Sequence, residues 1–198
     1  MRPSFIPLAV IAVVLLSVPG CASAPSRFYV LAPVAGSLPP AAGPGRELAV
    51  GVGPVTLPEY LDRPQIVTRT SRHELRLAEF ERWAEPLKDN VAQVLKENLA
   101  ILLPSQRVTA YPWKRATPID YQLTVAVWRF EWAADGQGEL KARWSLLSGD
   151  SQQELLTRTS SYDVRAASED YPAIVAAMNE ALAAFSRDAA AALRALPR

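Results

Sequence analysis

Cys21 is the residue best suited to covalent chemistry, and it is the only cysteine in the 198-residue chain. It directly follows Val18-Pro19-Gly20, and the segment before it carries one basic residue, Arg2, and an apolar run over 8–16. This layout is typical of a secretory signal, because the run is shorter than the roughly 20 residues of a membrane span. A thiol placed directly after a small residue can be thioether-linked to diacylglycerol, and cleavage then leaves Cys21 as an acylated N-terminus.

The segment around Cys21 resembles the signal of a bacterial lipoprotein, with Pro19 where such signals usually carry Ala, Ser or Thr. The alternatives are an ordinary signal peptide with an incidental cysteine, or a cysteine buried for packing. A single unpaired thiol is unusual in an exported chain, which favours the lipid anchor. Residue 22 is Ala rather than Asp, so by resemblance to the sorting rules of Gram-negative bacteria we expect the anchor in the outer membrane, with the protein facing the periplasm.

Three segments follow from this interpretation: a signal peptide over 1–20, the lipidated Cys21 with a short tether over 21–26, and one domain over 27–198. The five tether residues after Cys21 extend less than about 20 Å, which holds the domain near the membrane. Removing Arg2 with the signal leaves 20 of the 21 basic residues, against 20 acidic ones. This balance argues against binding to nucleic acid, which needs a basic surplus. We expect no cofactor and no metal beyond the acyl lipid on Cys21.

Catalytic residue patterns are weak. His73, the only histidine, falls in an expected turn without a neighbouring nucleophile. Glu79 and Glu81 would share a strand face roughly 7 Å apart, a spacing that could suit a glycosidase pair. Interleaved Arg76 and Arg82 favour a solvated, charge-paired face instead. With no Gly-x-Ser-x-Gly elbow and no metal-ligand spacing, the sequence predicts a protein that is not an enzyme.

The elements that position these residues follow from hydrophobic periodicity. Strands are expected at 27–31, 48–55, 65–72, 74–83 and 107–111, then from 119 to a turn at 135–138, and in return strands to 148 and over 154–164. An apolar slip at 127–128 indicates a β-bulge or a strand buried on both faces at that end, and the glycines at 51 and 53 indicate a close approach by another element. Helices are expected from Pro86 to Pro104 and from 168–172 to the end. This pattern predicts an α+β fold, an antiparallel sheet with two helices on one face.

The segment 57–67 is expected to be a rigid loop, because Pro58 and Pro64 fix two backbone angles. Its surroundings resemble the PqiC-type auxiliary lipoproteins of ABC and MCE transport systems. The resemblance is carried by the following runs: Gly53-Pro54-Val55, Leu57-Pro58, Tyr60-Leu61-Asp62-Arg63-Pro64-Gln65-Ile66-Val67, Trp83-Ala84-Glu85-Pro86-Leu87, and Phe28-Tyr29-Val30-Leu31 after the cysteine. It covers essentially the whole mature chain.

This resemblance implies a non-enzymatic outer-membrane lipoprotein of lipid transport and envelope integrity. Its implied partners are an MCE-domain periplasmic protein, which forms a lipid conduit, and the inner-membrane transporter of that system. We expect a homo-oligomeric ring, because a conduit needs an axial opening and homo-oligomers favour closed symmetry. The alternative function is a carrier of lipid or another small ligand, with its pocket between sheet and helices.

The expected partner or subunit interface comprises Tyr60, Leu61, Arg63, Pro64 and Trp83, because aromatic and Arg side chains dominate interface anchors. The alternative is that Tyr60 packs inward and that Asp62 pairs with Arg63 to hold the turn.

The tryptophans allow a second surface. Trp128, Trp132 and Trp144 could line a lipid-binding surface or a subunit contact, although core packing accounts for most of them. Arg129 and Glu131, which alternate with these aromatic residues, leave room for a half-exposed rim.

Overall fold

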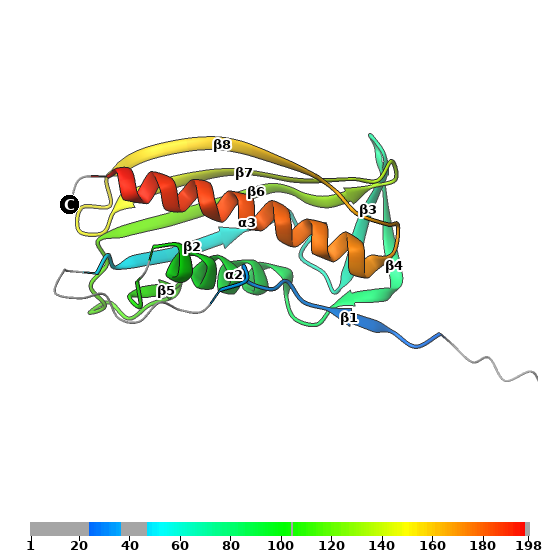
Figure 1. Cartoon of the computed structure of the whole chain (residues 1–198), viewed down its shortest axis with the longest axis horizontal. Helices are drawn as coiled ribbons and strands as arrows, with labels where there is room; N and C mark the ends of the chain where they lie inside the picture. Colours follow the sequence, from blue (N-terminus) through cyan, green and yellow to red (C-terminus); the bar gives the residue numbers. More distant parts are fainter. Residues whose placement is uncertain (1–23, 37–46, 104, 197–198) are drawn as a thin grey trace, which may run out of the picture.

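The structure is a computed structural model that describes residues 24–36, 47–103 and 105–196. Cys21 and the signal peptide lie outside these residues. The described elements, labelled as in Figure 1, are β1 (Arg27–Tyr29), β2 (Val50–Thr56), β3 (Gln65–Ser71), β4 (Glu74–Trp83), α2 (Leu87–Leu102), β5 (Val108–Ala110), β6 (Tyr121–Ala133), β7 (Gln137–Ser148), β8 (Glu154–Arg165) and α3 (Tyr171–Ala195). The expected strands and both expected helices are therefore present.

The strands form one sheet in the order β1-β4-β3-β6-β2-β5, and β7 and β8 extend it from β6. The α+β class is confirmed, but the sheet is mixed rather than antiparallel. The three hairpin pairs, β3–β4, β6–β7 and β7–β8, are antiparallel. The pairs β1–β4, β2–β5, β2–β6 and β3–β6 are parallel. The physical reason is connectivity: tight turns enforce antiparallel neighbours, whereas long connections allow strands distant in sequence to pair in parallel.

Both helices lie on the same side of the curved sheet, and α3 runs along most of its length (Figure 1). Their apolar stripes are buried as the periodicity predicts, at Val91, Val94, Leu95 and Leu99 on α2 and at Ile174, Met178, Leu182, Phe185 and Leu193 on α3. The helix starts differ in chemistry. Asp170 caps α3 by accepting a hydrogen bond from the Ala173 N–H at 2.8 Å. Pro86 occupies the N-cap position of α2 and makes no side-chain cap.

The predicted bulge in β6 is confirmed, since the register with β7 shifts between Val127 and Arg129. Trp128 lies at the bulge and is 46% exposed, whereas Trp132 and Trp144 are buried in the core. The Trp144 indole N–H donates to Ser160 Oγ at 3.1 Å. Core packing therefore accounts for two of the three tryptophans that could have formed a surface. Of the residues considered for a half-exposed rim, Trp128 and Arg129 are exposed.

The predicted close approach at a glycine is also confirmed. The Trp113 ring lies against Gly51 of β2, where an added Cβ would come within 2.7 Å of the ring. The Trp113 ring also packs nearly perpendicular to the Tyr111 ring, with ring centroids 5.4 Å apart. These contacts hold the segment after β5 against the first part of β2.

Candidate functional site

The first functional feature is a strap, residues 30–36, which leads from β1 across the two helices. Three asparagine side chains hold its backbone. Asn90 accepts from the Leu31 N–H at 2.7 Å, Asn179 accepts from the Ala32 N–H at 3.0 Å, and Asn98 accepts from the Val34 N–H at 2.7 Å. Strap backbone groups that cannot pair in a sheet are thereby satisfied.

The strap is also tied to both helices at once. The Asn98 amide donates to Ser186 Oγ of α3 at 2.9 Å, and Asn98 is only 1% exposed. Sequence reasoning missed this clamp, although a signal was present. Asn90 and Asn98 lie eight residues apart within the apolar stripe of α2, where a polar residue requires a hydrogen-bonding partner.

The second feature is the motif loop, residues 57–64, between β2 and β3. Its turns are closed by hydrogen bonds from the Leu61 N–H to the Pro58 carbonyl at 2.9 Å and from the Arg63 N–H to the Leu61 carbonyl at 2.9 Å. The Pro64 carbonyl accepts from the Trp83 N–H at 2.6 Å. The segment is therefore a loop of closed turns and not a strand, as its two prolines predict.

The expected interface residues divide into two groups. Leu61 and Trp83 are buried, at 2% and 5% exposure, so they support the loop from within the domain. Pro64 is exposed, and Tyr60 and Arg63 are half-buried. Only these last three offer surface to a partner, and their role in an interface stays a prediction.

An ion pair lies beneath Tyr60. Arg69 of β3 donates from Nε to Glu131 Oε1 of β6, and the Glu131 side chain is 4% exposed. The Tyr60 hydroxyl also points to β6, where it lies 3.5 Å from the Trp128 carbonyl. Burial, followed by the negative charge of the nearby Glu131 carboxylate, raises the pKa of Tyr60 to about 12. The inward packing weighed for Tyr60 is thus partly present. Glu131, expected at an exposed rim, is buried instead.

Two buried polar atoms in this region have no hydrogen-bonding partner in the described part of the chain, Arg63 Nε and Glu131 Oε2. The expected local ion pair between Asp62 and Arg63 is not formed among the described side chains. Arg63 is therefore held by its backbone and by packing, and its guanidinium group keeps unused hydrogen-bonding capacity at the edge of the loop.

A concave surface lies beside the motif loop. We call it the β2–α2 groove, because Val52–Leu57 form one wall and Lys88, Asp89 and Ala92 of α2 form the other. Tyr111 with Pro112, and Asp62 of the motif loop, also line it, and its volume is about 500 Å³. Three of the matching sequence runs therefore contribute to the lining of this groove: all of 53–55, Leu57 of 57–58 and Asp62 of 60–67.

The residues considered for catalysis are not assembled for it. Glu81 accepts from Arg27 Nη2 at 2.6 Å and from the Tyr29 hydroxyl at 2.6 Å. The Arg27 hydrogen bond, with a smaller contribution from that of Tyr29, lowers the pKa of Glu81, which keeps it ionised and unsuited to act as an acid. Its ion-pair partner is Arg27 of β1 rather than the interleaved arginines. His73 is exposed in the β3–β4 turn, and the described residues contain no cluster of metal-ligating side chains.

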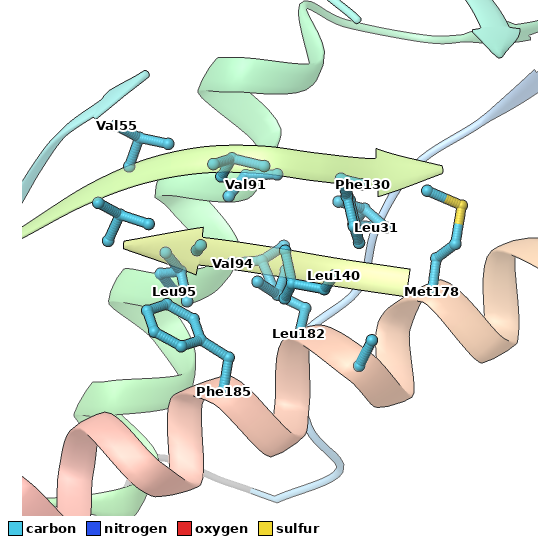
Figure 2. Close-up of a cluster of buried hydrophobic side chains, with 14 of the residues drawn as sticks. Leu31, Val55, Val91, Val94, Leu95, Phe130, Leu140, Met178, Leu182 and Phe185 are labelled. Atoms are coloured by element: carbon cyan, nitrogen blue, oxygen red, sulfur yellow. The ribbon is translucent and has the colours of Figure 1, made fainter. Parts of the chain in front are cut away.

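The space between sheet and helices is filled. Figure 2 shows Leu182 and Phe185 of α3 pointing toward Leu95 of α2 and Leu140 of β7. Among the described side chains, the gap enclosed by these residues and their neighbours has no room for a water molecule. Ligand pockets need roughly 300–1,000 Å³, so this interior holds no pocket for an acyl chain.

Comparison with known proteins decides the family. The family model for the ABC-type transport auxiliary lipoprotein component matches residues 29–190. The chain belongs to this family. The recognition drawn from the motif runs is thereby confirmed, and the match extends from β1 into α3.

Two crystal structures share the fold of this auxiliary lipoprotein. One, of an uncharacterized protein, has a TM-score of 0.69 at 23% identity, over 86% of this chain and 99% of that chain. The other, of a Xanthomonas campestris protein assigned to the DUF330 family, has a TM-score of 0.65 at 23% identity, over 82% and 92%. A search of curated protein sequences finds no match. Within the described residues of the auxiliary lipoprotein, neither helix is long and apolar enough to cross a membrane.

Proposed function

We propose that this auxiliary lipoprotein is anchored in the outer membrane through Cys21, where it docks a periplasm-spanning MCE conduit. The family is a component of ABC-type transport, and the proposal gives that component a place and a partner. It acts without catalysis. It holds the end of the conduit at a fixed position on the membrane and so supports envelope integrity.

The observation that carries the proposal is the clamped strap. Only five residues lie between Cys21 and the start of β1 at Arg27, so a lipid on Cys21 would hold the domain within about 20 Å of the membrane. Asn90 and Asn98 then join the strap to the helices, which makes a mechanically continuous path from anchor to domain. Such a path suits a holder, which has to resist displacement of its partner.

The filled interior supports a holder over a carrier. A carrier needs an internal cavity that accepts a ligand and releases it, whereas the described core is packed around Leu182 and Phe185. In the proposed assembly several copies form a closed ring around the conduit, with the exposed part of the motif loop facing a neighbour or the conduit.

The anchor is tested by fractionating cells that express the full chain or its Cys21→Ser variant. We expect the wild type in the outer-membrane fraction with bound acyl groups, and the variant unacylated in the periplasm. Equal fractionation of the two forms would contradict the lipid anchor.

The motif loop is tested by Arg63→Glu, with Arg76→Glu on β4 as a matched charge reversal away from the loop. We expect Arg63→Glu to weaken partner capture with little change in melting temperature, and Arg76→Glu to capture normally. Unfolding of the Arg63 variant would instead assign Arg63 a structural role.

A further inference from the structure

The strand β1 and the two residues after it carry apolar side chains on both faces. On the face toward the helices, Tyr29 is half-buried and Leu31 is 3% exposed. On the opposite face, Phe28 is 64% exposed and Val30 is 51% exposed. Phe28 is the most exposed of the large hydrophobic side chains in the described part of the chain. Solvent-facing positions of a strand are normally polar, so this second apolar face requires a cover.

The orientation of Phe28 is fixed by its neighbours in the strand. Arg27 Nη2 and the Tyr29 hydroxyl both donate to Glu81 of β4, each at 2.6 Å. The Tyr29 ring also lies 6.3 Å from the Tyr171 ring of α3, measured between centroids. Because Arg27 and Tyr29 share the helix side of the sheet, the side chain between them projects from the other side. Phe28 cannot turn toward the helices without breaking these contacts.

A basic side chain lies beside Phe28. Arg82 is its register partner on β4, and register partners on neighbouring strands project from the same face of a sheet. The Arg82 Nε donates to the Glu79 carbonyl at 3.4 Å, and Arg82 forms no ion pair with the described side chains. The other guanidinium nitrogens are therefore available to an anionic oxygen next to an exposed aromatic ring.

The length of the tether indicates what covers this face. Phe28 follows Cys21 by seven residues, which span at most about 25 Å. Residues 22–26 carry no charge, and the described part of this tether, 24–26, is exposed. A lipid on Cys21 therefore keeps Phe28 within reach of the membrane surface, and no acidic tether residue opposes contact with anionic lipid.

We propose that Phe28 and Val30 insert into the headgroup region of the membrane that holds the Cys21 lipid, where the Arg82 guanidinium binds a lipid phosphate. This inference rests on the proposed function, since it requires the lipid anchor. Apolar side chains next to basic ones are typical of surfaces that bind at the membrane interface. Each contact is weak alone, but the anchor makes it intramolecular and raises its effective concentration. The second attachment fixes how the domain is oriented on the membrane, which a tethered lipid alone does not.

The experiment places the environment-sensitive fluorophore NBD on a Phe28→Cys variant of the full-length acylated chain. Cys21 does not react, because its sulfur is held in the thioether to the lipid. The chain is reconstituted into vesicles of phosphatidylethanolamine and phosphatidylglycerol. We expect spin-labelled phospholipid to quench the probe at residue 28, and aqueous iodide to leave it bright.

The matched control is the same probe on Leu155→Cys. Leu155 is an apolar residue that is 40% exposed, and the start of β8 lies at the end of the molecule away from β1 (Figure 1). This probe should be quenched by iodide and not by the spin-labelled phospholipid. The same lipid quenching at residues 28 and 155 would mean that the membrane does not select β1, which overturns the proposal.

The competing cover is a second copy of the chain. The Phe28→Cys probe in the unanchored Cys21→Ser background, studied without lipid, detects it. We expect iodide to quench this probe fully. Protection from iodide in the absence of lipid would assign Phe28 to a contact between copies and would overturn the proposal.

Flotation of the vesicles separates failure of this inference from failure of the proposed function. If the acylated chain floats with the vesicles and iodide still quenches the probe at residue 28, the anchor stands and membrane insertion of β1 is refuted. If the chain carries no acyl group and does not float, the proposed anchor fails, and this inference fails with it.

The phosphate contact is tested by Arg82→Glu in the chain labelled at residue 28. Arg76→Glu, roughly 20 Å away along β4, is the matched charge reversal. We expect Arg82→Glu to lower the ratio of membrane-embedded to water-exposed probe about fivefold, equivalent to about 1 kcal/mol, and Arg76→Glu to leave it unchanged. Equal ratios from the two variants would contradict the phosphate contact. Thermal melting of both variants checks that they fold.

Discussion

Arg69 of β3 is paired with the buried carboxylate of Glu131 on β6, and this ion pair joins two parallel strands directly beneath the motif loop. Glu131 is 4% exposed and Arg69 is 23% exposed, so one charge is removed from water and the other is partly solvated. Removal of one partner from such a pair is more damaging than removal of both, because the remaining charge loses its compensation.

We therefore predict that Glu131→Gln lowers the free energy of unfolding by about 2 kcal/mol, less than for a fully buried pair because Arg69 is partly solvated. The double variant Arg69→Met with Glu131→Leu should recover to within about 1 kcal/mol of the wild type, since it removes both charges. Urea unfolding of the mature Cys21→Ser chain measures both. If the double variant has a lower free energy of unfolding than Glu131→Gln, the charge-compensation argument is wrong.

The Tyr60 hydroxyl predicts an alkaline effect. Its pKa is about 12 in the folded chain, against about 10 in an unfolded one. The unfolded state thus loses this proton first as the pH rises, so the stability that Tyr60 contributes is full below pH 10 and is lost between pH 10 and 12. Tyr60→Phe should make the free energy of unfolding fall less steeply over this interval. Tyr29 and Tyr162, whose pKa values are also about 12, retain their part of the slope.

Denaturant unfolding at a series of pH values checks this, together with the ultraviolet absorbance of tyrosinate in the folded protein. Parallel stability curves for wild type and Tyr60→Phe above pH 10 would show that Tyr60 is solvated like a free tyrosine.

The strap should weaken when its clamp is removed. Asn98→Ala leaves the Val34 N–H without its acceptor, and we expect a loss of about 2 kcal/mol and faster proteolysis within residues 30–36. The control is Gln93→Ala on the exposed face of α2, where the side chain bonds only to Glu97. That variant should stay within about 0.5 kcal/mol of the wild type. Unchanged proteolysis in Asn98→Ala would mean that the strap is held by other contacts.

The filled interior makes two linked predictions. Leu182→Ala should lose about 3 kcal/mol through a new cavity, whereas Glu180→Ala on the exposed side of α3 should lose little. The wild type, stripped of lipid, should not bind a fluorescent phospholipid in solution. Stoichiometric binding would revive the carrier alternative, because it would require the core to open.

Local pattern was sufficient for most of the secondary structure. Alternation placed β3 and β4 around His73, and the slip at 127–128 located the bulge in β6. These features depend on neighbouring residues in the sequence. The parallel pairing of β1 with β4 does not, because it brings Arg27 beside Glu81 across more than fifty residues. No periodicity encodes that choice, which explains why an antiparallel sheet was expected.

The candidate site was predicted in outline only. The motif runs located the loop, and its two prolines predicted its rigidity, but burial divides the five expected interface residues, with Leu61 and Trp83 inside the domain. The sequence predicts a half-exposed Glu131, because its ion-pair partner Arg69 lies on another strand and is not visible in the local pattern. The groove likewise depends on where β5 stops along β2, which only the assembled sheet determines.

The most direct test of the central claim is a crosslinked purification of the tagged full-length chain from the outer membrane, with Cys21→Ser as control. Mass spectrometry and light scattering of the eluate identify the partner and the oligomeric state. The proposed docking function predicts an MCE-domain protein together with several copies of the lipoprotein, recovered from the wild type and depleted with the variant. A monomer that carries lipid and no protein partner would contradict it.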